Sequence, residues 1–327
     1  MRYILGVDLG GTNIVVGTVA EDGSAVLGVS STATRPEEGA DAVVGRIVQM
    51  CRDSAAQAAA QGMKPEQIAG VGIGSPGPLD RVQGIVLVTP NLGWKNFPVR
   101  QRVSDALDGL PATLDNDANC AVFGEWWLGA GRGSNHLIGL TIGTGIGGGI
   151  VIDGKLYHGA SDAAGEVGHM TIDSTGRRCK CGNYGCLEAY ASGPNIAARA
   201  VEGMEAGAET RLGSYVNGDL SRITAQTVYQ AAHDGDEYAL EVVKETAKLL
   251  GIGVANLINI FNPDTVVIMG GVTLAGDRLF VPLRSEVRKR AFKTAVEHCQ
   301  IKPGELPGTA GVVGAVATFK QQLWGRP

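Results

Sequence analysis

The stretch DLGGTN occupies residues 8–13, between the apolar runs YILGVD at 3–8 and IVVGTV at 14–19. Glycine tolerates the positive φ of tight turns, so this pattern predicts two strands joined by a Gly/Thr turn. The same plan returns at 137–153, where LIGLTI, the turn GTGIGGG and the strand GIVID follow one another. Two copies of one hairpin, each heading its own strands and helices, predict a duplicated α/β fold with two domains around a cleft.

Apolar periodicity and helix-breaking residues divide the rest of the chain into further elements. Strands are expected at 25–34, 68–74, 85–88, 112–115, 265–269 and 297–301, and helices at 38–62, 99–108, 118–128, 193–204, 224–234, 236–260, 279–291 and 310–323. No long linker separates the halves, so the repeat sets the expected boundary near Asp117. We expect a small N-terminal domain at 1–117 and a large domain at 118–309, with a C-terminal helix within 310–327 returning to the small domain.

Composition excludes several classes of protein. The chain has 327 residues, of which 44% are hydrophobic and 19% charged, as in ordinary globular proteins. The net charge is -5, and Lys and Arg form no large cluster, which argues against nucleic acid as a partner. The first apolar run soon meets Asp8, which is unlike a signal peptide, and no apolar run has the length of a membrane span. These features predict a cytoplasmic protein.

Residues 166–188 read EVGHMTIDSTGRRCKCGNYGCLE and contain a candidate metal site. One imidazole and three thiolates fill the four positions of tetrahedral zinc. A disulfide is the alternative, but Cys179 and Cys181 are too close in sequence to pair easily. Four protein ligands leave no position for water, so the predicted zinc is structural and its ligands are His169, Cys179, Cys181 and Cys186.

Two carboxylates, Glu166 and Glu188, bracket these ligands. A loop held rigid by a metal would bring both carboxylates together. Carboxylates accept hydrogen bonds from hydroxyl groups, so the pair suits a polyhydroxylated ligand. His169 can serve both purposes, with one ring nitrogen on zinc and the other facing the substrate.

The two glycine hairpins are candidate phosphate sites, because tight glycine turns expose backbone N–H groups and Thr hydroxyls add donors. Each turn alone reads as a plain β-turn, but the two at equivalent places favour phosphate binding. Neither fits the P-loop spacing, and a strand rather than a helix follows the glycines, so the dinucleotide fingerprint fails too. Asp8 can hold Mg²⁺ through water. The expected phosphate-binding residues are Asp8, Gly10, Gly11, Thr12, Asn13, Thr141, Gly143, Thr144 and Gly145.

Three further motifs carry polar groups or glycines at strand ends. LDNDAN at 114–119 can supply a general base, although Asn116 or Asp117 also fits a helix N-cap. Asn91, in TPNLGW, can bind a sugar hydroxyl, although capping a turn is the simpler interpretation. Gly270 and Gly271 follow a buried strand and permit close approach of an adenine–ribose group, or else form a helix entry turn.

Taken in order, DLGGTN, TPNLGW, LDNDAN, IGTGIGGG, EVGH and CKCGNYGCLE resemble the ROK family of sugar kinases, and most of all its bacterial glucokinases. The resemblance covers nearly the whole chain. It implies the actin-like, hexokinase-type ATPase fold, ATP with Mg²⁺ as phosphoryl donor, glucose phosphorylated on its 6-hydroxyl, and a homodimer or larger assembly. It makes Asp117 the base and His169 and the three cysteines zinc ligands. The implied sugar-binding residues are Gly77, Asn91, Asn116, Asp117, Glu166, His169 and Glu188.

The alternatives are a kinase for another hexose (N-acetylglucosamine, N-acetylmannosamine or fructose), a sugar-sensing regulator, and a zinc-held scaffold. Family repressors carry a DNA-binding N-terminal extension, whereas this sequence begins at the first expected strand. A scaffold leaves the duplicated hairpins unexplained. One departure from the family pattern is visible: many members have a Lys in or just after the first hairpin, where this chain has Asn13, Val15 and Val16.

Overall fold

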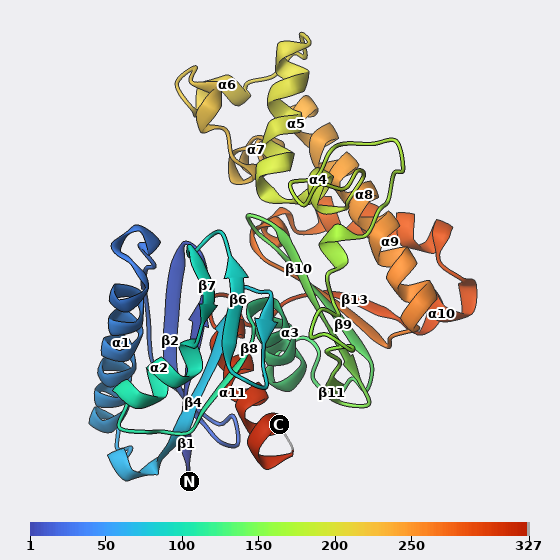
Figure 1. Ribbon diagram of the computed structural model, residues 1–327. Coiled ribbons are helices and arrows are strands. Elements are labelled where there is room, and N and C mark those ends of the chain that lie inside the picture. The colour runs from blue at the N-terminus through green and yellow to red at the C-terminus, as the bar shows by residue number, and fades with distance from the viewer. Residues whose placement is uncertain (326–327) are drawn as a thin grey trace. The chain divides into compact units, whose positions relative to one another are not determined.

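The computed structural model describes residues 1–325, and within them two five-stranded sheets share one plan (Figure 1). The first has the order β3 (Val26–Ala33), β2 (Asn13–Ala20), β1 (Tyr3–Leu9), β4 (Ile68–Ser75) and β8 (Ala112–Asn116). The second has the order β11 (Lys155–Leu156), β10 (Ile146–Ile152), β9 (Leu137–Ile142), β12 (Thr265–Met269) and β13 (Gln300–Pro303). In each sheet a hairpin is followed by parallel strands: β1, β4 and β8 in the first, and β9, β12 and β13 in the second. The predicted duplicated α/β fold is therefore confirmed.

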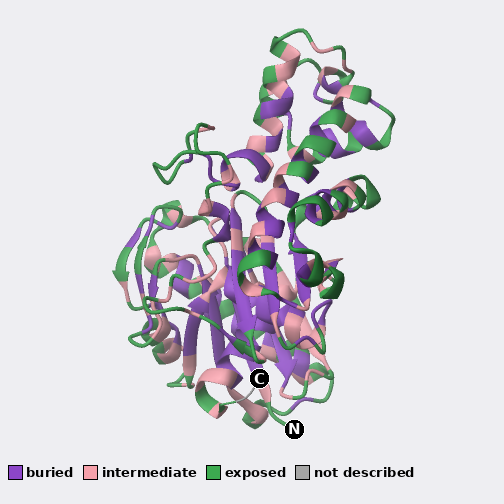
Figure 2. Cartoon of the chain, turned by 90° about the vertical axis from the view of Figure 1, so that its right-hand side faces the viewer, coloured by how far each residue is buried: buried purple, intermediate pink, exposed green. Residues whose placement is uncertain are grey.

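Contacts divide the chain into two compact units, each discontinuous in sequence. Unit 1 comprises 1–134, 149–165 and 305–327, and unit 2 comprises 135–148 and 166–304. The chain passes from unit 2 to unit 1 after Gly148, which lies within β10. In both units the central sheet strands, such as β1 and β12, are buried over most of their length, whereas the edge strand β3 has no buried residue and the loops between elements are mostly exposed (Figure 2). No helix within residues 1–325 is long and apolar enough to cross a membrane.

The helices of unit 1 are α1 (Ala40–Ala60), α2 (Val99–Ala106), α3 (Asp117–Leu128) and α11 (Ala310–Trp324). Side chains of a strand alternate between its two faces. In β1, Leu5, Val7 and Leu9 join the core that includes α1 and α2. Gly6 faces the opposite side of the sheet and lies against α11, where an added Cβ would overlap the carbonyl oxygen of Val312. Glycine in the first strand therefore lets α11 pack directly on the sheet.

A small three-stranded sheet, β5 (Leu79–Asp80), β6 (Ile85–Thr89) and β7 (Trp94–Phe97), belongs to the same unit. Trp94 is buried, and its ring lies 4.5 Å from that of Phe97, centroid to centroid. Only the middle strand was predicted from the sequence, because strands of two to four residues are too short to show a period.

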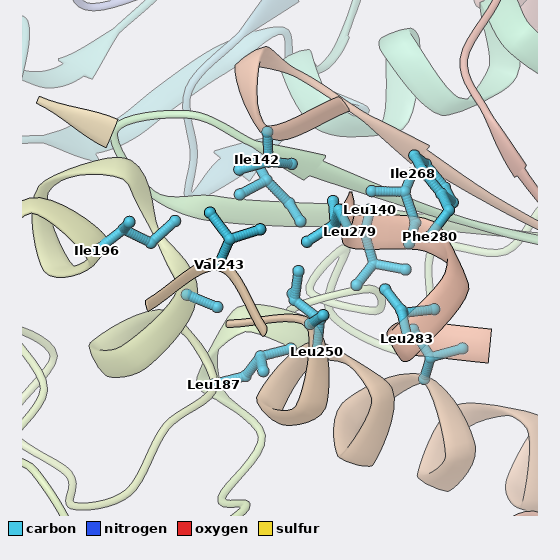
Figure 3. Close-up of a cluster of buried hydrophobic side chains, with 14 of the residues drawn as sticks. Leu140, Ile142, Leu187, Ile196, Val243, Leu250, Ile268, Leu279, Phe280 and Leu283 are labelled. Atoms are coloured by element: carbon cyan, nitrogen blue, oxygen red, sulfur yellow. The ribbon is translucent and has the colours of Figure 1, made fainter. Parts of the chain in front are cut away.

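The core of unit 2 forms where helices pack on β9 and β12 (Figure 3). Leu140 and Ile142 come from β9 and Ile268 from β12; α8 contributes Val243 and Leu250. The helices of this unit are α4 (Glu188–Ala191), α5 (Gly193–Glu205), α6 (Leu212–Tyr215), α7 (Ala225–His233), α8 (Glu237–Phe261), α9 (Asp277–Arg290) and α10 (Lys293–His298).

Two element predictions in the second half of the chain were inaccurate. The strand expected at 297–301 is instead the end of α10 followed by β13, which starts at Gln300. The second hairpin turn is shorter than expected, because β10 begins at Ile146 rather than Gly149. Three consecutive glycines suggest a turn, but here 147–149 lie within a strand, where Gly149 leaves room for Val122. Packing against α3 thus overrides the low strand propensity of glycine.

Candidate active site

Polar side chains of unit 1 gather where three parallel strands end. In the register of the sheet Asp8 of β1 pairs with Gly74 of β4, and Gly74 pairs with Asp115 of β8. Asp117 is the first residue of α3. A Cβ added at Gly74 would lie 3.5 Å from the Cα atom of Asp117, so the small strand residue allows α3 to begin close to the sheet. The carboxyl ends of parallel strands are the usual place for a ligand site in such folds.

Asn116 caps α3, because its Oδ1 accepts hydrogen bonds from the backbone N–H groups of Ala118 and Asn119 at 3.0 and 3.1 Å. Its amide nitrogen faces Gly77: a Cβ added there would lie 3.6 Å from Asn116 Nδ2. A helix cap and a ligand-binding role are thus compatible for Asn116, because its side-chain oxygen caps α3 and its side-chain nitrogen lies at the Gly77 turn.

The carboxylate of Asp8 lies in an unusual electrostatic environment. Burial raises the pKa of Asp8 to about 7, and the negative charge of Asp117 contributes to the shift. The first turn of α11 is packed against the same carboxylate, since a Cβ added at Gly311 would overlap its Oδ2. Two neighbouring carboxylates repel each other unless a proton or a cation lies between them. Oxygen donors of this kind suit Mg²⁺, so the surroundings of Asp8 fit the magnesium-binding role that the sequence suggests for it.

The first glycine hairpin lies beside the TPNLGW loop. Gly10 N–H donates to the carbonyl of Asn13 at 2.9 Å and closes the turn, while Thr12 and Asn13 are exposed. A Cβ added at Gly11 would lie 2.9 Å from the Cβ of Asn91. Asn91 is 80 residues after Gly11 in the sequence. The fold therefore places it next to the turn of the first hairpin.

In unit 2, His169, Cys179, Cys181 and Cys186 form one cluster whose ligand atoms all lie within 4.8 Å of one another. The Sγ atoms of Cys181 and Cys186 are 3.7 Å apart, and all six cysteines are free thiols. Two thiolates at about 2.3 Å from a tetrahedral zinc would be about 3.8 Å apart, so the spacing fits a shared metal and not a disulfide. His169 Nδ1 lies 3.8 Å from the Sγ of Cys179. The donor set thus fits zinc.

The carboxylates of Glu166 and Glu188, which flank this cluster in the sequence, also lie next to it in the structure. His169 Nε2, the ring nitrogen other than the one beside Cys179, is 4.0 Å from Glu166 Oε2. Glu188 Oε1 lies 4.0 Å from Cys179 Sγ, and its Oε2 accepts the N–H of Ile146 at 2.8 Å. Glu188 therefore links the cysteine cluster to the second glycine hairpin, a link that no local sequence pattern indicates.

The second hairpin is held by two further contacts within unit 2. Gly193 N–H, at the start of α5, donates to the carbonyl of Gly143 at 2.8 Å. Gly270 has φ 98°, and a Cβ there would overlap the carbonyl oxygen of Ile142, so only glycine fits. Gly271, by contrast, has open space around it. Gly270 and Gly271 thus lie at the edge where β9, with Thr141 near its end, leads into the turn of Gly143, Thr144 and Gly145.

A model described as the ROK family matches residues 4–322 of this sequence. The chain belongs to the ROK family. A glucokinase of Thermotoga maritima is 38% identical over 323 residues, which cover 98% of each protein. The xylose repressor of Caldicellulosiruptor bescii is 40% identical over 253 residues, 77% of this chain and 63% of the repressor. The crystal structure of a ROK family glucokinase from Streptomyces griseus in complex with glucose and AMPPNP has a TM-score of 0.83 at 33% identity, covering 98% of this chain and 99% of that one.

Family membership and the structural similarity confirm the resemblance and the actin-like, hexokinase-type fold. Within this ROK chain the predicted residues form two sets. Unit 1 brings together Asp8, the first hairpin, Gly77, Asn91, Asn116 and Asp117. Unit 2 brings together the second hairpin, Glu166, Glu188, Gly270, Gly271 and the His/Cys cluster.

Sequence reasoning gave His158 no role, yet its Nε2 lies 3.0 Å from the carboxylate of Asp115, two residues before Asp117. Arg81 also donates to this carboxylate, from its Nε at 3.1 Å. These residues are 43 and 34 positions from Asp115, and neither belongs to a recognisable motif. Only the tertiary structure shows the association.

Proposed function

We propose that this protein is an ATP-dependent hexose kinase that transfers the γ-phosphate of ATP to the 6-hydroxyl of glucose. The observation that carries the proposal is the pair of carboxylates, Asp8 and Asp117, beside the first glycine hairpin of unit 1. A relative of full length is named a glucokinase, and a ROK glucokinase of the same fold binds glucose and AMPPNP.

In this proposal Asp117 is the general base. As the 6-hydroxyl attacks phosphorus, its proton passes to the Asp117 carboxylate, which the start of α3 holds at the end of β8. General-base assistance of this kind contributes about 10²–10⁴ in rate. Asp8 is the residue that would hold Mg²⁺, which when bound neutralises charge on the phosphates. Backbone N–H groups of the turn at Gly11, Thr12 and Asn13 would add dipoles where many relatives have a Lys, while the N–H of Gly10 closes the turn.

Unit 2 contributes sugar binding and nucleotide binding. We propose that Glu166, His169 and Glu188 accept and donate hydrogen bonds to sugar hydroxyls, as Gly77, Asn91 and Asn116 do in unit 1. Zinc on His169 and the three cysteines has a structural role here, fixing the loop that carries these groups. The second hairpin and Gly270–Gly271 are assigned to the phosphates and the adenosine of ATP. The expected homodimer or larger assembly stays a prediction.

An ADP-release assay with Mg-ATP across a panel of hexoses, with a blank lacking sugar, tests the proposal. We expect rapid release of ADP with glucose and little without sugar. A preference for N-acetylglucosamine, N-acetylmannosamine or fructose would preserve the mechanism and change the substrate. Turnover equal in the blank and with every sugar would contradict a sugar kinase.

The second candidate is a sugar-binding regulator, which the 40% identity to a xylose repressor favours. The same assay separates the two functions. A zinc-loaded preparation that binds sugar by calorimetry but releases no ADP with any hexose would support the regulator.

A further inference from the structure

The carboxylate of Asp115 is the centre of a buried hydrogen-bond network in unit 1. Its side chain is 1% exposed. Oδ2 accepts hydrogen bonds from His158 Nε2 at 3.0 Å, Arg81 Nε at 3.1 Å and Gln322 Nε2 at 3.1 Å. Oδ1 accepts the backbone N–H of Asn116 at 2.9 Å. An ionised carboxylate only accepts, so the Nε2 atom of His158 carries a proton.

The donors come from segments that are distant in sequence. Arg81 follows β5, His158 follows β11, and Gln322 belongs to α11. Arg81 also donates from Nη1 to Asp162 at 2.9 Å, so its guanidinium joins Asp115 to the segment 157–165. These contacts fix the last residues of β8 from three sides.

The partners of Asp115 stabilise its ionised form. Burial alone would raise the pKa of Asp115, but the hydrogen bond and charge of His158, the charge of Arg81 and the N–H of Asn116 outweigh it and hold the pKa below its ordinary value. The carboxylate is therefore an anion that depends on its partners. Removing one partner of a buried charged group is costly, because the remaining charge loses its compensation.

We propose that Asp115, His158 and Arg81 are positioning residues that hold Asp117 in its working orientation. The inference rests on the proposed function, in which Asp117 is the base. The link is short: Asp115 fixes the N–H of Asn116, the Asn116 side chain caps α3, and Asp117 is the first residue of that helix. A displacement of about 1 Å at a reacting group can cost about 10²-fold in rate.

The test compares His158→Leu, which removes the donor, with His158→Gln, whose amide can place an N–H where Nε2 lies. Turnover, glucose KM and melting temperature are measured on folded, zinc-loaded protein. We expect His158→Leu to lower kcat at least tenfold with glucose KM within twofold of wild type, and His158→Gln to recover most of the loss. His298→Leu, at a histidine whose ring bonds only its own helix turn, is the control and should match wild type.

A purely structural role would give a different result. The inference fails if His158→Leu lowers the melting temperature but leaves kcat per folded molecule unchanged, or if the Gln and Leu variants lose activity equally. If His158→Leu does not fold, Arg81→Lys is tested in its place. The lysine keeps the positive charge but cannot bond Asp115 and Asp162 through two separate nitrogens, so the variant should lower kcat and leave glucose KM unchanged. Wild-type protein without turnover on any hexose would instead refute the proposed function, and this inference with it.

Discussion

The two glycine hairpins occupy equivalent places in two sheets of the same strand order, yet their surroundings differ. The first lies in unit 1 beside Asp8 and Asp117, two carboxylates close enough to shift a pKa. Around the second, in unit 2, the carboxylate of Glu188 is satisfied by the N–H of Ile146 and adjoins the His/Cys cluster.

The difference indicates a division of labour. A carboxylate with a raised pKa beside another carboxylate is suited to moving protons and holding a cation. A carboxylate fixed by a backbone N–H, on a loop that the proposed zinc would hold rigid, is suited to binding at constant geometry. In the proposed function, different side chains at the two strand ends would give unit 1 the proton transfer, the cation site and part of the sugar site, and would give unit 2 a rigid binding surface.

The largest effect is expected for the base in unit 1. Asp117→Asn keeps the shape of the side chain but cannot accept the proton, so kcat should fall by about 10²–10⁴. Steady-state ADP release at saturating glucose measures the loss. Asp53→Asn, on the exposed face of α1, is the matched control and should retain full activity. A kcat near that of wild type in Asp117→Asn would contradict the assignment of Asp117 as the general base.

The next effect concerns the proposed zinc site in unit 2. Cys181→Ser removes one of four ligands, so zinc content should fall well below one per chain and glucose KM should rise by about tenfold as the loop loosens. Metal analysis and ADP release give the two readouts. Cys299→Ser, at a cysteine outside the cluster, should change neither. Full zinc occupancy in Cys181→Ser would exclude that thiol as a ligand.

A smaller effect is expected at the edge of the second hairpin. Gly270→Ala forces a Cβ against the carbonyl of Ile142 at a positive φ, which should lower the free energy of unfolding by on the order of 2 kcal/mol and raise the KM for ATP. Gly271→Ala meets no neighbouring protein atom and should have the free energy of unfolding of wild type. Chemical denaturation measures the first quantity. Equal stability of the two variants would show that the turn is not tightly packed there.

An effect of similar size is expected in the pH dependence of unit 1. Between about pH 4 and pH 7 folded Asp8 keeps a proton that the unfolded chain has lost, so the free energy of unfolding should fall as pH rises through this range. Asp8→Asn should remove that fall and stabilise the metal-free protein at pH 8 by on the order of 2 kcal/mol, since each pKa unit is worth about 1.4 kcal/mol and the side chain keeps some solvent contact. Melting curves from pH 4 to pH 8 provide the comparison. Parallel curves for wild type and variant would show that Asp8 is not destabilised by its surroundings.

Local patterns in the sequence predicted the features whose residues lie close together along the chain. The first hairpin, the individual strands of its sheet and the His/Cys cluster are of this kind, because spacing alone limits what they can form. The start of β10 at Ile146 and the helix at 293–298 were missed, since packing against α3 and short element length override propensity.

Contacts between segments that are distant along the chain could not be predicted from the sequence. His158 and Arg81 reach Asp115 only because loops, β8 and α11 converge in the folded unit. Glu125 is a similar case: it is buried and accepts the N–H groups of Glu305 and Leu306, about 180 residues away, where the chain re-enters unit 1. A single acidic residue in a helix gives no sign of such a partner.

The division of labour is tested most directly by measuring glucose affinity by calorimetry, together with kcat, in Asp117→Asn and Glu188→Gln. The account predicts that Asp117→Asn binds glucose within a few-fold of wild type while losing turnover. Glu188→Gln should weaken glucose binding about tenfold or more, as for loss of a hydrogen bond to a charged group, and retain most of its kcat at saturating sugar. The reverse pattern, with affinity lost in Asp117→Asn and turnover lost in Glu188→Gln, would contradict the account.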